Sequence, residues 1–221
     1  WRARGHFHTP QWNGLGLIAL ALALALHLYA TPLKTFPLSA LALVMTLAAC
    51  VWLVWGSEAL RASAYAFVVL ALMIPLPFID RISPTLEAST ARAAVAFVST
   101  LGTEAVAYGS QIKLPAAAFE VGAASSGLRS LAALTTLAVV FTGLVEGPRW
   151  GKAIIILAAV PIALLANVFR VATILQVAQL FGQAAGNFYH DYSSPPLFLV
   201  AFILLILVAK GVRCSEMRFA A

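Results

Sequence analysis

The stretch Ala153-Ile-Ile-Ile-Leu-Ala-Ala-Val-Pro-Ile-Ala-Leu-Leu-Ala-Asn-Val-Phe-Arg-Val-Ala-Thr-Ile-Leu-Gln-Val-Ala-Gln-Leu180 decides the class of fold. It is longer than the roughly 20 apolar residues that a helix needs to cross the hydrocarbon core of a bilayer. Its one charged residue is Arg170. The sequence therefore predicts a transmembrane helix here, with a single ionisable group inside an otherwise apolar run.

The rest of the chain has the same character. Of its 221 residues 62% are hydrophobic and 10% are charged, and the mean hydropathy is +0.95, whereas soluble domains are only about half apolar. Apolar runs recur from about residue 15 to residue 212, so no stretch is left for a separate soluble domain. We predict a single integral membrane domain over residues 1–221.

The expected fold is an all-α polytopic bundle with six spans, at residues 15–30, 38–55, 62–78, 128–145, 153–180 and 196–212. The segment 85–106 is polar for a span, because it contains Glu87, Arg92 and Glu104. Its apolar residues gather on one side, which favours an outer helix in the membrane interface. Seven spans are the alternative.

Segments 108–113 and 117–121 flank Leu114-Pro115, which predicts a short β-hairpin before the next span.

The formal net charge is +6, but its distribution argues against a nucleic-acid site. The basic residues lie at the ends of the predicted spans, at Arg2, Arg4, Arg61, Arg149, Lys152, Lys210, Arg213 and Arg218. With six spans all of these residues fall on one side, so both termini are expected to be cytoplasmic. Two cysteines, Cys50 and Cys214, predict no disulfide framework, and neither they nor the four histidines show metal-ligand spacing, so no metal or cofactor is expected.

Three polar residues reach a similar depth when helical rise is counted from the inner ends of their helices. At about 1.5 Å per residue, Ser125, Arg170 and His190 lie about 31, 27 and 30 Å from the inner charges. A hydroxyl, a guanidinium and an imidazole at one membrane surface suit nucleophilic acyl chemistry.

Each of these residues also has a plainer interpretation. Arg170, with Asn167 one turn earlier, could be an arginine that snorkels to the outer headgroups, helped by Gln176 and Gln179. Arg129 shares a helix face with Ser125 and could bind a substrate carboxylate or an anionic headgroup, or anchor the helix at the interface. His190 could be an interfacial polar residue. Asp191 could support it, although adjacent residues on a helix do not face each other.

Several motifs in order along the chain carry a family resemblance. They are Pro75-Leu-Pro77, Ile112-Lys-Leu-Pro115, Val121-Gly-Ala-Ala-Ser-Ser-Gly-Leu-Arg-Ser-Leu131, Pro161-Ile-Ala-Leu-Leu-Ala-Asn-Val-Phe-Arg170 and His190-Asp191. Together they resemble the core of the exosortase/archaeosortase family of membrane-embedded peptidase-transpeptidases, from about Arg61 onward. The family patterns are Cys-Ser-Gly-x-Arg-Ser, Asn-x-x-Arg and a later His.

The resemblance implies a role for each matched residue. Ser125 stands at the nucleophilic cysteine, Arg170 at the catalytic arginine and His190 at the catalytic histidine, while Arg129, Asn167 and Asp191 are expected to bind substrate. The implied substrates are membrane proteins with a C-terminal sorting signal, made of a Pro-Glu-Pro-like motif, a transmembrane helix and a basic cluster. Transfer to an acceptor amine or glycolipid would follow cleavage. The implied location is a bacterial or archaeal cytoplasmic membrane, with the site at the outer face.

The chain departs from the family pattern in having Ser125 for the cysteine and Ser194 where a glycine is common. A serine hydroxyl has little anionic character at neutral pH, so we expect an inactive nucleophile. An introduced Cys→Ser substitution and a natural variant both explain Ser125, and we favour the former because one atom differs. Two other functions compete: a non-enzymatic transporter or assembly subunit that binds an anionic lipid or solute, and a rhomboid-like serine protease using Ser126.

Overall fold

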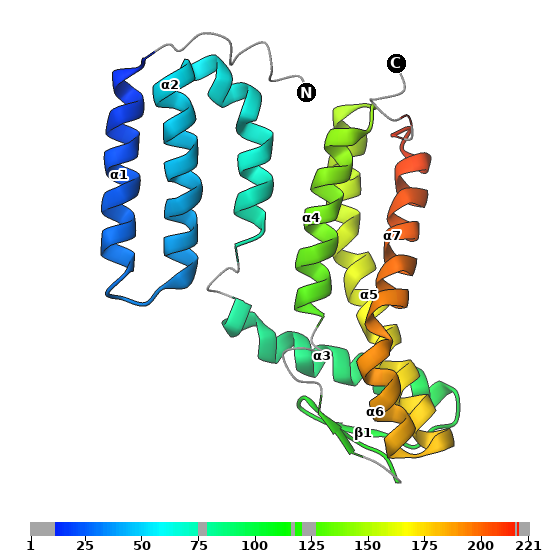
Figure 1. The fold of residues 1–221 in the computed structure, drawn as a ribbon. Helices are drawn as coiled ribbons and strands as arrows, with labels where there is room; N and C mark the ends of the chain where they lie inside the picture. Colours follow the sequence, from blue (N-terminus) through cyan, green and yellow to red (C-terminus); the bar gives the residue numbers. More distant parts are fainter. Residues whose placement is uncertain (1–11, 75–78, 116–117, 121–126, 215, 217–221) are drawn as a thin grey trace. The chain divides into compact units, whose positions relative to one another are not determined.

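The computed structural model describes residues 12–74, 79–115, 118–120, 127–214 and 216. The chain forms two compact units, Trp1–Pro77 and Phe78–Ala221 (Figure 1). The expectation of a single domain stays a prediction.

The first unit contains α1 (Gly14–Ala30) and α2 (Phe36–Leu72). The Asn13 side chain begins α1 by accepting a hydrogen bond of 3.0 Å from the Leu15 main-chain nitrogen. α2 bends at Gly56, whose φ of 79° and ψ of −174° lie outside the helical region (Figure 1). A glycine tolerates this conformation because it has no Cβ. The second and third predicted spans are therefore the two arms of α2.

Small residues let α1 and the first arm of α2 approach closely. They recur every seven positions on both helices and are buried at Gly16, Ala23, Ala30, Ala42, Ala49 and Gly56. A Cβ added to Gly16 would lie only 2.5 Å from the Leu53 Cα. Such contacts between small residues are how helices associate within lipid, where burial of apolar area gives no driving force.

The second unit holds the remaining elements. Its helices are α3 (Ile79–Thr100), α4 (Leu128–Leu144), α5 (Arg149–Phe181), α6 (Gln183–Tyr192) and α7 (Ser194–Gly211). α4, α5 and α7 run side by side around a core that includes Leu134, Ile155 and Leu205, each fully buried (Figure 1). In the described residues, α2, α5 and α7 are long and apolar enough to span a membrane, and α1 and α4 are shorter apolar helices. The predicted all-α polytopic membrane fold is confirmed.

α3 lies across one end of the α4–α5–α7 bundle instead of running along it (Figure 1). Ala91, Ala94 and Val98 form its buried side, whereas Arg92 is exposed. Helical spacing gathers these apolar residues on one face, as in a helix lying in an interface. This orientation agrees with the predicted interfacial helix and not with a seventh span, although the helix begins earlier than residue 85.

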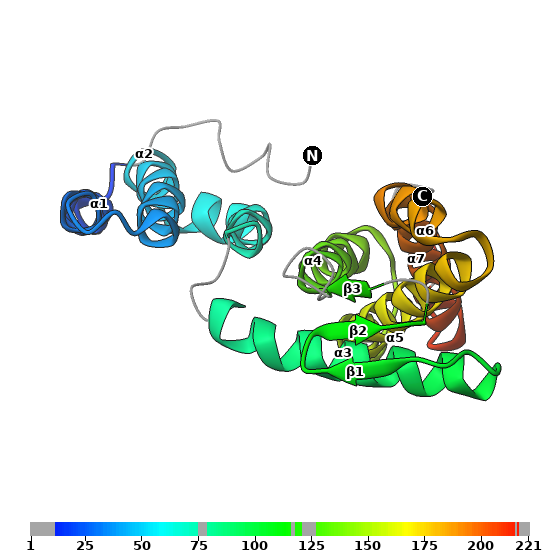
Figure 2. The same ribbon diagram turned by 90° about the horizontal axis from the view of Figure 1, so that it is seen from below.

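A three-stranded antiparallel sheet follows α3, with β1 (Val106–Tyr108), β2 (Gln111–Lys113) and β3 (Ala118–Glu120) in the order β1-β2-β3. β1 lies beside α3 and β3 lies toward α4 (Figure 2). The predicted continuous strand over 108–113 is wrong, because Gly109, at a φ of 62°, turns the chain back after Tyr108. A two-residue hairpin turn favours glycine at such a position. The predicted turn at Leu114-Pro115 lies between β2 and β3.

α5 extends beyond the length that a membrane requires. Its 33 residues correspond to roughly 50 Å of helix, against a hydrocarbon thickness of about 30 Å. Its carboxyl-terminal part, including Val171, Ala172 and Leu175, is buried in a core shared with α3 and with Ile112 of the sheet. Arg170 lies about 30 Å along the helix from Arg149. It is therefore located where the part of α5 that is long enough to span a membrane meets the layer formed by α3 and the sheet.

Candidate active site

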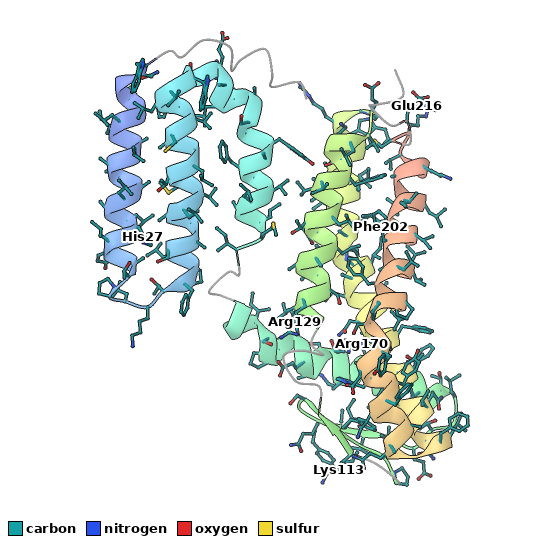
Figure 3. The ribbon with its side chains drawn as sticks, viewed as in Figure 1. His27, Lys113, Arg129, Arg170, Phe202 and Glu216 are labelled. Atoms are coloured by element: carbon teal, nitrogen blue, oxygen red, sulfur yellow. The ribbon has the colours of Figure 1, made fainter. Side chains whose placement is uncertain are left out.

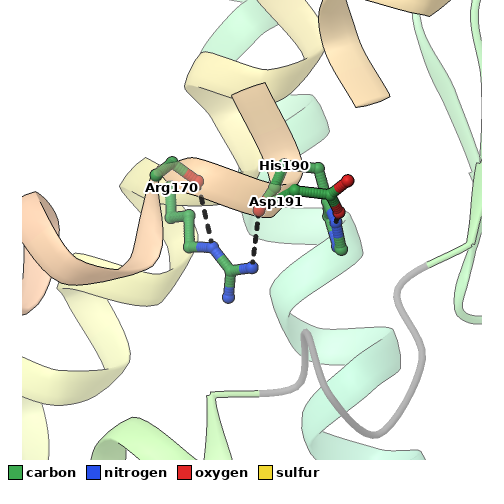
Figure 4. A network of polar contacts seen from close by, with 4 residues as sticks. Arg170, His190 and Asp191 are labelled. Carbon is green, nitrogen blue, oxygen red and sulfur yellow. Dashed lines mark hydrogen bonds and ion pairs between the residues drawn. The ribbon is translucent and has the colours of Figure 1, made fainter. Parts of the chain in front are cut away.

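Arg170 is the buried centre of the candidate site, with 8% of its surface exposed. Its Nε donates a hydrogen bond to Ser193 Oγ at 3.3 Å, and its Nη2 donates to the His190 main-chain oxygen at 3.4 Å (Figure 4). Nη1 makes no hydrogen bond to any residue that the structure describes. One edge of the guanidinium is thus held by the protein, while Nη1 can donate a hydrogen bond to a further acceptor.

A reversal of the chain after α5 returns His190 to the level of Arg170. α5 ends at Gly182, whose φ of 85° and ψ of 170° allow the turn into α6. Gly186 then lets α6 pack closely, since a Cβ there would lie 2.8 Å from both Ala178 of α5 and Phe119 of β3. The contact between β3 and α6 connects the sheet to the helix that bears His190.

His190 and Asp191 form a close pair at the end of α6. His190 Nδ1 lies 3.2 Å from Asp191 Oδ1, and the two side chains are 37% and 71% exposed. The sequence argument that adjacent helical residues do not face each other is wrong here, because the two side chains are in contact in the last turn of α6. In Figure 4 the imidazole lies beside this carboxylate, and Arg170 contacts the main chain of His190. The contact engages Nδ1 of the imidazole.

The start of α4 docks on α5 through Gly127 and Asn167. Asn167 is 3% exposed and lies one turn before Arg170. Gly127 precedes α4 with a φ of 83°, and its carbonyl accepts the first bond of the helix from Leu131 N at 2.8 Å. A Cβ on Gly127 would lie 2.8 Å from Asn167 Cγ. Ser125, the predicted nucleophile position, lies outside the described residues, two positions before this contact.

A cavity of about 20 Å³ opens beside these residues, between α4, α5 and α7. Its lining includes Ser130, Asn167, Arg170 and Ser194 among apolar side chains. This volume is about that of one water-sized probe, and a water needs two or more polar partners. The cavity therefore presents a small polar space within an apolar bundle.

Arg129 lies in the first turn of α4 and is exposed. Figure 3 shows Arg129 and Arg170 toward the same end of the bundle, where α3 crosses it. Unlike Arg170, Arg129 presents its charge at the surface, where it can meet a mobile anionic group.

Sequence reasoning missed Ser193 as a partner of Arg170. Ser193 is 2% exposed, and serine before a helix is usually interpreted as a cap. The suggested help from Gln176 to a snorkelling arginine is also not what the structure shows. Gln176 accepts a hydrogen bond of 2.8 Å from Thr103, which connects α5 to the chain after α3.

Substituting Gly127 by alanine tests the contact between α4 and α5. We expect the free energy of unfolding to fall by about 2–4 kcal/mol, because the Cβ adds a clash with Asn167 to the strain of positive φ. Gly102→Ala is the matched control, since Gly102 has the same φ of 83° and a Cβ there would meet no described residue beyond its chain neighbours within 4 Å. It should lose only about 1–2 kcal/mol. Equal thermal unfolding midpoints for the two variants in detergent would contradict this contact.

These features define a multi-pass helical membrane protein. At one end of its bundle lie a buried arginine, a histidine–carboxylate pair and a helix, α4, whose first turn packs on α5 through a glycine. The chain belongs to the transmembrane exosortase family, since the family model described as Transmembrane exosortase (Exosortase_EpsH) matches residues 1–207. Exosortases are generally cysteine proteases or transpeptidases. Comparison with curated proteins and with solved structures finds no match. The resemblance found in the motifs is thus confirmed at the level of the family.

Proposed function

We propose that this chain has the site of an exosortase-type protease and transpeptidase, with residue 125 at the nucleophile position, Arg170 as the catalytic arginine and His190 as the proton-transfer group. The observation that best supports this function is the hydrogen bonding of Arg170, which joins its guanidinium to the main chain of His190 and leaves Nη1 for another acceptor. Two peptide units limit the distance from Gly127 to residue 125 to about 7 Å. The Gly127–Asn167 contact is therefore consistent with a nucleophile close to Arg170.

The reaction would begin with a nucleophile at residue 125 attacking the scissile carbonyl carbon. Nη1 of Arg170 would donate to the oxyanion that forms, in an environment with little water, where such donors are most effective. His190 would take the proton of the nucleophile through Nε2, since Asp191 engages Nδ1. When the peptide bond breaks, that proton would pass to the leaving amine.

An acyl-enzyme would then join the amino-terminal part of the substrate to residue 125. An acceptor amine, a hydroxyl of a glycolipid, or water would attack the acyl carbon, and the nucleophile would leave and be reprotonated. His190 would accept the proton of the attacking group at this stage. A site at the membrane surface that limits water favours transfer over hydrolysis.

The proposed substrates are membrane proteins that end in a short motif, a transmembrane helix and a basic cluster. The exposed Arg129 would bind an anionic group of the substrate, because a guanidinium can donate two parallel hydrogen bonds to a carboxylate. Asn167 borders the cavity beside Arg170 and would contact the substrate main chain. Asp191 would orient His190. We place the site at the outer face of a bacterial or archaeal cytoplasmic membrane, with both termini inside.

The serine at position 125 makes this form of the chain inactive in our proposal. A thiol near an arginine can ionise at neutral pH, whereas a serine hydroxyl needs a strong adjacent base. We attribute Ser125 to an introduced Cys→Ser substitution. Cleavage of a tagged sorting-signal protein by the Ser125→Cys form tests the proposed function.

A further inference from the structure

Ser193 occupies the junction of α6 and α7 in a position where its hydroxyl cannot act as a helix cap. A serine before a helix usually accepts a hydrogen bond from the second or third main-chain N–H of that helix. In α7 these positions are Pro195 and Pro196, which have no N–H. Accordingly, the Ser193 side chain makes no capping bond. The capping role therefore does not account for a serine at this place.

The hydroxyl instead accepts the hydrogen bond from Arg170 Nε, and both residues are buried. Ser193 and the main-chain oxygen of His190 together hold two nitrogens along one edge of the planar guanidinium. Two bonds on one edge fix the plane of the group, because the guanidinium is a rigid fork. A single bond would leave it free to rotate about that contact.

We propose that Ser193 is a positioning residue, whose buried hydroxyl fixes the plane of the Arg170 guanidinium and so holds Nη1 in a set orientation for the reaction. This inference rests on the proposed function of Arg170. Ser193 does not touch the reacting atoms and acts through the arginine. Its loss should weaken the effect of Arg170 on the nucleophile while leaving the helices in place.

The test is the rate at which iodoacetamide alkylates residue 125 in the Ser125→Cys protein at neutral pH. The Ser125 chain, which retains Cys50 and Cys214, gives the background to subtract. Ser193→Thr and Ser193→Val form the decisive pair, because they have the same shape and differ in the hydroxyl. Ser193→Ala removes the hydroxyl without adding bulk. Thr142→Val, which removes a buried hydroxyl bonded to Val139 O at 2.8 Å within α4, is the control.

We expect Ser193→Ala and Ser193→Val to slow alkylation about tenfold, because a rise of one unit in the pKa of the thiol lowers the thiolate fraction by that factor. Ser193→Thr and Thr142→Val should stay within about twofold of the parent. Equal rates for the threonine and valine variants would overturn the inference, whether both are fast or both are slow. The pair remains informative even where Ser193→Ala does not fold.

Arg170→Gln, which removes the positive charge, separates this inference from the function on which it rests. A rate that depends on Arg170 but not on the hydroxyl at position 193 would overturn the inference and leave the proposed function standing. A rate that depends on neither residue would overturn both.

Discussion

The Ser125→Cys protein is expected to cleave a tagged sorting-signal substrate at least about 10³-fold faster than the chain with Ser125. Loss of a nucleophile in enzymes of this chemical type costs several orders of magnitude, and a serine lacks the thiolate that a neighbouring arginine can stabilise. The rate would be measured in vesicles that contain enzyme and substrate, from the appearance of the carboxyl-terminal fragment. Turnover by the serine form at the rate of the cysteine form would contradict our account.

Ser126→Cys is the matched control for this experiment, because it places the same thiol one residue further along the chain. It should stay inactive. Ser126→Ala in the Ser125→Cys background should retain cleavage. If Ser126 proves essential and Ser125 dispensable, the rhomboid-like alternative replaces the exosortase mechanism.

Arg170→Lys in the Ser125→Cys protein is expected to lower the cleavage rate by about 10²–10³-fold, the usual cost of removing an oxyanion donor. A lysine keeps the positive charge, but its ammonium is a compact point charge without the planar fork. It cannot hold Ser193 Oγ and the His190 main-chain oxygen on one edge while presenting a third nitrogen. The charge alone should therefore not restore activity.

Arg92→Lys is the control for this substitution, since Arg92 is an exposed arginine on α3 that bonds to Ala88 O of its own helix. We expect its cleavage rate to match the parent. Gel filtration in detergent would establish that both variants are folded. Retention of full activity by folded Arg170→Lys would refute the role of the guanidinium geometry.

The spans could be predicted from the sequence because hydrocarbon thickness sets the length of an apolar run. The same argument placed Arg170 and His190 at a common depth. Two features of the fold required the structure. Apolarity indicates the spans but not how they are connected, so the direct connection of the second and third spans at Gly56 was not foreseen. The first strand of the hairpin was predicted too long because residues 108–113 alternate weakly, and only the backbone at Gly109 shows the turn within them.

In the candidate site, the sequence identified residue types but not their contacts. Ser193 was missed because no local pattern relates it to Arg170, which lies 23 positions earlier in the chain. The contact between Gly127 and Asn167 could not be predicted from the sequence either, because it joins two helices through residues that are far apart in the chain. Contacts of this kind depend on packing between elements, which local patterns do not encode.

The central claim is that residue 125 occupies the nucleophile position of an exosortase-type site, and the most direct test is the residue on which an acyl-enzyme forms. The Ser125→Cys protein would be mixed with tagged substrate, quenched in acid and digested, and the adduct located by mass spectrometry. We predict a hydroxylamine-sensitive thioester between the cysteine introduced at position 125 and the amino-terminal part of the substrate. Cleavage without any adduct at position 125, or with the adduct on Cys50 or Cys214, would contradict the claim.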